Sequence, residues 1–523
     1  MKLTDVNTTD IREAIRLGCE TMGRVFDADD GDGDIPFFDV VVRPQARMAF
    51  SPGASESHVP GRHLNALLNA EDAAGIKIDE DSVDRHARAA FFSYGGPIAF
   101  PLNRDEVGGP LTNFVAHHAR EGFHALYALA KYRDSARARA IAEAGLAAIN
   151  EYWDPDRDWD YDRLEQNHGL TTMRNQPFMH GLARAIGPLV KYYRATGYGP
   201  ALELATVLKD KCVAEVFTAD GSYDRESFGD HTHSTTCVMS SLAQLADLTS
   251  DLSLMQRVKA FYDHGLWDIR DEFGWVVESS GEGRDPDKGE VNNSGDILET
   301  ALLLGKWGFA EGYHDAERIL RCHILPSQLR DVSFIAQPPN LDGVDGMRDV
   351  AARLQGAFGF PAPYGHEPLD APDVKFNLDI VGGTVGSLCE ALRAATTYNE
   401  AGHHVNLLFD HETPDIEVES PYTHPALRVR VKRPAPLYVR IPPWVDRDAL
   451  RIDGVPGQAL QTEGYAFIAE PPVGKWITFQ FPLVEHSTEL SHRTRTIRTR
   501  MRGDAVAAME SFGADLTFFD PLD

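Results

Sequence analysis

The stretch "LARAIGPLVKYYRATG", residues 182–197, indicates the fold class because its apolar side chains recur with the period of a helix. They stand at steps of four, three, one and three residues, on one helix face: Leu182, Ile186, Leu189, Val190 and Tyr193. The same spacing returns in "SSLAQLADLTSD" at 240–251, and again at Ile297, Ala301 and Leu304. The sequence therefore predicts several amphipathic helices.

Between about residues 60 and 395, such stretches alternate with connections rich in Gly, Pro and Asp. The segment "ARARAIAEAGLAAINEYW" at 136–153 supplies small side chains of high helix propensity, which allow close contact between helices. No fixed sequence repeat is evident, yet twelve helices of roughly 33 residues each, loops included, would fill this region. We expect a mainly α fold, an (α/α)6 toroid of helical hairpins.

After about residue 400 the period changes to two. The segments "ALRVRVKR" at 426–433, "LYVRI" at 437–441 and "WITFQF" at 476–481 are rich in β-branched and aromatic residues. Turn signals such as "IDGVPG" at 452–457 separate them. We therefore predict two domains: residues 1–400 as the helical barrel, and residues 401–523 as a β-sandwich with an irregular C-terminal tail.

Composition narrows the choice of partners. The chain has 523 residues and a net charge of −28, with 79 acids against 51 bases, which argues against a nucleic-acid partner or an anionic membrane. No apolar run approaches the roughly 18 residues of a spanning helix, and the N-terminus lacks a signal-peptide core. Five cysteines are scattered without CxxC pairs. A cytoplasmic protein is expected, with a homo-oligomer left open.

Three segments carry a resemblance to a known family: "HTHSTTCVMSSLAQLADLTSD" at 231–251, "VVESSGEGRDPDKGEVNNSGDILETALLL" at 276–304 and "LYVRIPPWVDRDALRIDG" at 437–454. They resemble the six-hairpin (α/α)6-barrel glycosidases, and among these the β-L-arabinofuranosidase-like family 127 group. The resemblance implies a helical barrel followed by a β-domain, and a hydrolase acting on a carbohydrate.

The chain departs from that family at its metal site. The resemblance matches Glu290 to a zinc-ligand glutamate, but Asn292 stands where the family has a cysteine. The segment "FNLDIVGGTVGSLCEAL" at 376–392 lacks the later pair of cysteines, and Cys389 comes too late to replace it. Because a zinc site needs around four ligands, we expect no metal and no cofactor, and a mechanism based on two carboxyl groups.

The acid-rich loop before the helix at 297–304 supplies candidates for that chemistry. Through the resemblance, Glu282 corresponds to the acid/base residue, and Glu290 or Asp379 would be its carboxylate partner. Cleavage of a glycosidic bond needs one acid to protonate the leaving oxygen and a second carboxylate as base or nucleophile. The alternative is local: Asn293 or Ser294 would cap the helix, and Asp296 would favour its positive end.

Further polar and aromatic residues are expected to contact substrate. His231 and His233 suit metal binding, sugar binding or general base catalysis, or a structural role; on one helix they would diverge by about 200°. The planar side chains of Arg174, Asn175 and Gln176 suit hydrogen bonds to sugar hydroxyls or to a uronate carboxylate. The Trp275 ring, near the acidic loop, suits stacking on a sugar face. The expected substrate-binding residues are His233, Arg174, Asn175, Gln176, Trp275 and Asn292.

Two other functions remain open. A lyase would use His231 or His233 to remove a proton beside a uronate carboxylate that Arg174 and Asn175 neutralise. A non-catalytic sugar-binding protein is the other alternative, because a fold does not determine its function.

Overall fold

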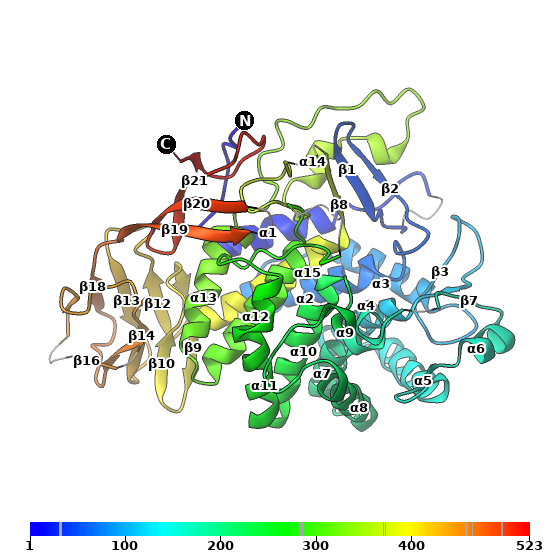
Figure 1. Cartoon of the computed structure of the whole chain (residues 1–523), viewed down its shortest axis with the longest axis horizontal. Helices are drawn as coiled ribbons and strands as arrows, with labels where there is room; N and C mark the ends of the chain where they lie inside the picture. The colour runs from blue at the N-terminus through cyan, green and yellow to red at the C-terminus, as the bar shows by residue number, and fades with distance from the viewer. Residues whose placement is uncertain are drawn as a thin grey trace.

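A computed structural model describes residues 1–30, 34–174, 176–281, 287–369, 371, 373–455, 459–462, 464–492 and 495–522. Helices make up most of the first 395 residues and strands most of the rest (Figure 1). The two termini lie side by side, because Lys2 forms a β-bridge with Thr517.

Six helices of the described chain form an inner ring, each in contact with the next, and the sixth closes on the first. They are α2 (Val59–Ala74), α4 (Ala119–Tyr132), α7 (Ile186–Thr196), α10 (Thr232–Thr249), α12 (Val291–Lys306) and α15 (Asp379–Ala395). Six outer helices of the described chain pack against this ring: α1 (Ile11–Met22), α3 (Glu80–Ser93), α5 (Ala136–Tyr152), α8 (Gly199–Glu215), α11 (Leu252–Asp263) and α13 (Glu311–Ile319). This is the α/α toroid expected from the helical periodicity.

Close approach of the inner helices depends on glycine. A Cβ atom at Gly61 of α2 would overlap the backbone of Glu121 on α4. A Cβ atom at Gly382 of α15 would lie 2.6 Å from the carbonyl carbon of Arg62 on α2. Since no side chain fits at either contact, α2 lies directly against both neighbours, and Arg62 is held beside Glu121 and the start of α15.

Ten strands between residues 396 and 480 form two five-stranded sheets. The first has β16 (Leu460–Gln461), β17 (Tyr465–Ile468), β14 (Leu437–Arg440), β10 (Gly402–Val405) and β9 (Thr396–Asn399) in that order. The second has β11 (His411–Glu412), β12 (Ile416–Glu419), β13 (Leu427–Val431), β18 (Trp476–Gln480) and β15 (Arg451–Asp453). Alternate residues of both sheets belong to one apolar cluster, as the period of two predicts.

The C-terminal tail differs from the irregular segment that we expected. It forms a four-stranded sheet of β19 (Glu485–His492), β20 (Arg495–Arg502), β21 (Ala505–Met509) and β22 (Asp520–Pro521). Ile497 and Met501 of β20 are buried in the apolar core of the helical part, whereas the arginines between them are not. The alternation in "RTIRTRMR" is a strand signal that the high density of arginine concealed.

Shorter elements lie in the loops that join the helices. The small strands are β1 (Asp39–Arg43), β2 (Arg47–Ala49), β3 (Leu102–Asn103), β4 (Asn113–Phe114), β5 (Trp153–Asp154), β6 (Asp158–Trp159), β7 (Thr171–Thr172) and β8 (Val374–Asn377). The small helices are α6 (Tyr161–His168), α9 (Arg225–Phe228) and α14 (Val350–Leu354). Strand β8 pairs with β1 and ends immediately before α15, which places Asp379. Within the described ranges, every helix is too short or too polar to cross a membrane.

Candidate active site

The inner helices bring buried charged residues together at their N-terminal ends. We call Arg62, Glu121, His233, Glu290 and Asp379 the buried cluster; each is less than 9% exposed. They come from α2, α4, α10, the residue before α12, and the first residue of α15. The ring of helices therefore assembles side chains that lie more than three hundred residues apart in the chain.

Arg62 is the centre of this cluster. Its Nη1 lies 2.8 Å from Asp379 Oδ2 and 3.8 Å from Glu290 Oε1. Its Nη2 lies 3.2 Å from Glu121 Oε1. A single guanidinium thus faces three carboxyl groups, and burial strengthens these interactions relative to water.

Two of the three carboxyl groups are held in the ionised form. Burial opposes ionisation of Asp379, but Arg62 and His58 outweigh it and lower its pKa to about 2. Burial likewise opposes ionisation of Glu121, and the cations of Arg184, His58, Arg62 and Arg120 hold its pKa well below the ordinary value. Both groups can therefore act as permanent negative charges.

Glu290 has the opposite electrostatics. Burial raises its pKa to about 7, the charge of Asp379 contributes to the increase, and Arg62 opposes it. Burial also raises the pKa of Asp296 to about 7, against the charge of Arg120. His233 lies between the two acids, with Nδ1 3.5 Å from Glu290 Oε1 and Nε2 3.4 Å from Asp296 Oδ2. An imidazole thus connects two carboxyl groups that titrate in the same range.

Several imidazoles lie beside the buried cluster. The ring of His231 lies 5.5 Å from that of His117 and 5.3 Å from that of His180, while His58 and His117 stack at 5.6 Å. Burial, together with Arg184 and other nearby cations, lowers the pKa of His231 well below its usual value. A neutral imidazole both donates and accepts hydrogen bonds, which suits sugar hydroxyls.

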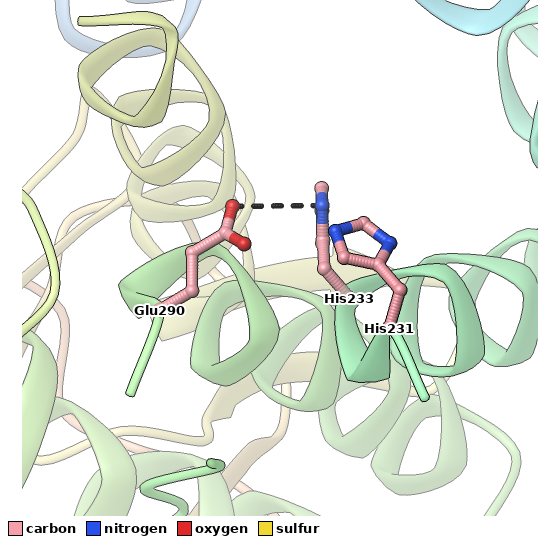
Figure 2. Close-up of side chains that lie close together, drawn as sticks. All are labelled: His231, His233 and Glu290. Carbon is pink, nitrogen blue, oxygen red and sulfur yellow. Dashed lines mark ion pairs between the residues drawn. The ribbon is translucent and has the colours of Figure 1, made fainter. Parts of the chain in front are cut away.

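His231 and His233 do not diverge, as they would on one regular helix. His231 is the extended N-cap residue of α10 and His233 lies in its first turn, so the two rings are 5.9 Å apart. Figure 2 shows both side chains on the same side of α10 as Glu290. This geometry is the convergent arrangement that an extended segment permits.

His231, His233 and Glu290 also offer one ligand atom each within 4.8 Å of one another. Arg62 competes with a cation there, since Nη2 lies 3.5 Å from His233 Nδ1. The thiolate zinc site that the resemblance implies does not fit these residues. Asn292 donates to Glu290 Oε1 at 2.9 Å, and all five cysteines are buried without a disulfide. A metal here would need the two imidazoles and the carboxylate alone.

The other residues that the sequence predicted for the site have different environments. Trp275 is 1% exposed and donates from Nε1 to the Pro361 carbonyl at 2.9 Å, so it is a core residue with no face for a sugar. Arg174 is exposed and forms an ion pair with Glu165 at 2.6 Å. Gln176 donates to the Met173 sulfur. Glu282 and Asn175 lie outside the described residues.

The prediction that Asn293 or Ser294 caps α12 is wrong. The helix begins earlier, at Val291, so Glu290 is the N-cap residue and Asn293 and Ser294 lie inside the helix. Asn293 donates to the Thr232 hydroxyl at 3.0 Å and Ser294 to the Gly274 carbonyl at 2.6 Å. Of the described acids just before this helix, Glu290 belongs to the buried cluster, whereas Asp287 pairs with His492 at 2.9 Å.

Sequence reasoning missed Arg62 and Glu121, and with them Arg120, Arg184, His58 and His117. A signal exists in "HVPGRHLNALLNA" at 58–70 and "HHAREGFHALYALA" at 117–130, where charged residues occupy the first turn of an otherwise apolar helix. Charged groups are seldom buried without partners. Their repetition at two helix starts thus indicates a shared polar centre.

A toroid with buried acids at the N-terminal ends of its inner helices defines the α/α-toroid glycosidase class of fold, and solved structures agree. The chain is similar to a family 127 glycoside hydrolase, a β-arabinofuranosidase, with a TM-score of 0.59 and 12% identity over 96% of this chain and 83% of that one. It is also similar to a family 127 β-L-arabinofuranosidase from Geobacillus stearothermophilus T6, with a TM-score of 0.54 and 14% identity over 95% and 80% of the two chains.

A sugar epimerase from a ruminal bacterium matches too, with a TM-score of 0.50 and 12% identity over 73% of this chain and 98% of that one. No protein-family model matches the sequence, and no curated protein matches it. At these identities the likeness establishes the toroid fold, and the activity has to be argued from the site itself.

Proposed function

We propose that this protein is a glycoside hydrolase in which Glu290 is the proton donor and Asp379 is the base or nucleophile. The observation that carries the proposal is that Arg62 contacts both carboxyl groups while their pKa values are about 7 and about 2. Glycosidases need one protonated and one ionised carboxyl group at the same pH, and environments that separate two pKa values identify such a pair.

The spacing of the two acids supports a double-displacement reaction. Because both oxygens contact Arg62 Nη1, they can be no farther apart than the 2.8 Å and 3.8 Å contacts taken end to end. That limit includes the separation of about 5 Å typical of retaining enzymes and barely reaches the inverting range of about 6.5 to 9.5 Å. Asp379 would attack the anomeric carbon while Glu290 protonates the leaving oxygen.

Glu290 would regain its proton in the second step, when its carboxylate removes a proton from the water that attacks the glycosyl ester of Asp379. His233 lies beside this carboxylate, with Nδ1 3.5 Å from Glu290 Oε1. A small polar cavity of about 30 Å³ adjoins Arg62, His233 and Asp296 and has room for a water molecule.

Glu282 remains a candidate for the proton donor through the family resemblance. Its loop leaves the described chain at Gly281, where Ser280 donates to the Asp230 carbonyl at 2.9 Å beside His231. The loop thus starts beside the buried cluster. Gln substitutions at positions 282 and 290, made separately, distinguish the two candidates.

The similar family 127 structures bear the name of β-arabinofuranosidases, and a furanoside is one substrate class to test. Because this chain lacks cysteines at the positions that the resemblance assigns to the thioglycosyl chemistry, we propose that a carboxylate takes that role. We further propose that the two five-stranded sheets form the expected sandwich, with the barrel ending near residue 400, because their buried faces share one apolar cluster.

The lyase alternative is less well supported. Its expected carboxylate-neutralising residue, Arg174, is exposed and occupied by Glu165 and Asp162. A similar structure bears the name of a sugar epimerase, so epimerisation is another reaction to consider. Epimerisation requires a proton acceptor on each face of the sugar. The observed pair of acids with separated acidities is the requirement for hydrolysis.

A panel of aryl glycosides and oligosaccharides tests the proposal. Hydrolysis of at least one substrate should fall by at least a thousandfold in both Glu290→Gln and Asp379→Asn, with unfolding temperatures near that of the parent. An ultraviolet-absorbing unsaturated uronate product would instead identify a lyase. Saturable glycan binding with no cleavage of any panel member would identify a binding protein and overturn the proposal.

A further inference from the structure

A large cleft lies at the opposite end of the ring from the buried cluster. It has a volume of about 960 Å³, at the upper end of the roughly 300 to 1,000 Å³ of small-molecule sites. Side chains from all six inner helices line one wall, and the sheet that contains β10, β14 and β17 lines the other. The cleft contains none of the proposed catalytic residues, although Lys191, Gln244 and Glu299 line both the cleft and the small cavity beside Arg62.

The sheet presents an aromatic surface to this cleft. In β10, β14 and β17, Val405, Val439 and Ala466 point into the apolar cluster, and the residues beside them point the other way. Two of those rings, His404 and Tyr438, stack with centroids 4.6 Å apart and planes at 4°. Phe467 of β17 lies on the other side of Tyr438, with ring centroids 4.8 Å apart, so the faces of Tyr438 are covered and its edge and hydroxyl are what it offers to a ligand in the cleft.

The opposite wall carries an excess of positive charge. Five cations line the cleft: Lys131, Lys191, Arg194, Lys306 and Arg393. Four of them lie in the last turn of an inner helix, where a cation also stabilises the helix C-terminus. Arg194 and Lys306 pair with Asp247, and Arg393 pairs with Glu390.

Neither a helix C-terminus nor an acidic partner accounts for Lys191 in the cleft. It lies in the middle of α7, and among the described residues its ammonium forms no hydrogen bond or ion pair. The Tyr438 hydroxyl likewise has no hydrogen bond to the described part of the chain. The remaining acid on the wall, Glu299, accepts from Ser387 at 2.7 Å and Gln244 at 3.3 Å. Lys131 bonds only to tyrosine hydroxyls, so two lysines remain without a carboxylate.

We infer that this cleft is a second ligand site that binds an acidic saccharide, with sugar hydroxyls bonded to the Tyr438 hydroxyl and the anionic group between Lys131 and Lys191. Charge complementarity favours an anion, since these lysines are unneutralised in a protein whose net charge is −28. A neutral sugar would leave both ammonium groups unpaired. The anion is a carboxylate or a sulfate, two groups that a lysine pair recognises in the same way.

Isothermal titration of the full chain with a galacturonate trisaccharide, its methyl ester and a sulfated trisaccharide tests the site. Using Glu290→Gln prevents turnover, and binding here does not depend on the proposed catalytic function. We expect saturable binding of one or both acidic probes and at least tenfold weaker binding of the ester. Comparison of the carboxylate with the sulfate identifies the anion.

Substitutions in each wall of the cleft show whether the ligand binds there. Lys191→Met and Tyr438→Ala should each weaken it at least tenfold, whereas Lys475→Met should not, because Lys475 is an exposed lysine on a turn away from the cleft. Use of both walls keeps the test valid if one variant is unstable. Equal affinity in all variants, no binding of either acidic probe, or equal binding of the ester would overturn the inference.

Discussion

Arg62 Nη1 lies 2.8 Å from Asp379 Oδ2, in an ion pair that joins the first turn of α2 to the first residue of α15. Both side chains are about 3% exposed, so the pair is formed away from water. The approach of the two helices at Gly382 permits this contact. The pair keeps a carboxylate ionised next to Glu290, which the same arginine contacts more weakly.

Replacement of Arg62 should move the acid limb of the activity profile. In Arg62→Gln, Asp379 loses its main cation, so its pKa rises from about 2 and the acid limb shifts upward by at least one pH unit. Loss of a buried partner also costs about 3 to 5 kcal/mol of stability. Arg62→Lys keeps the charge and should restore most of the profile. An acid limb unchanged in Arg62→Gln would contradict the role of Asp379.

The basic limb should report Glu290. Its pKa is raised from the ordinary value to about 7, so the protonated form persists up to that pH and is lost above it. Between about pH 3 and 6 kcat/KM should be level, and above about pH 7 it should fall tenfold per unit. Steady-state kinetics from pH 3 to 10 measure this. Activity that still rises above pH 8 is incompatible with Glu290 as the acid.

Comparison of Glu282→Gln with Glu290→Gln separates the two possible proton donors. If Glu290 is the donor, its variant should lose at least a thousandfold in kcat on a poor leaving group and much less on an activated aryl glycoside, since that substrate needs little protonation. Glu282→Gln should then lose less than tenfold on both. The reverse pattern would transfer the role to Glu282.

Asp296 should make stability depend on pH. Its raised pKa means that the folded state binds a proton more tightly than the unfolded state, so this stabilisation is present below the ordinary pKa and is lost as pH rises through about 7. Asp296→Asn imitates the protonated form. By urea unfolding it should be close to the parent at pH 3 and about 4 kcal/mol more stable at pH 9. An equal difference at both pH values would refute this electrostatic account.

Removal of metal should leave the protein unchanged. Although His231, His233 and Glu290 converge, Arg62 already supplies a positive charge beside them. Dialysis against a chelator should therefore alter neither the unfolding temperature nor kcat/KM, and added zinc should restore nothing. A loss of either quantity that zinc reverses would show that these three residues hold an ion.

The amino-acid sequence by itself determined the sequence of local structures: helices where apolar side chains recur every three to four residues, and strands where they alternate. His231 and His233 could be selected from their chemistry and spacing, whereas Glu290 and Asp379 were selected through the family resemblance. The "RTIRTRMR" strand was concealed only by its charge.

Only the tertiary structure decided which charges meet. Arg62 and Asp379 are 317 positions apart, and their contact depends on closure of the ring through glycines that have no pattern of their own. Burial and neighbouring charge, rather than residue type, then make Glu290 an acid and Asp379 a carboxylate. Burial by the folded chain also makes Trp275 a core residue. A sequence does not show which side of a loop the rest of the chain will cover. Protonation depends on desolvation and distance, which exist only once the chain has folded.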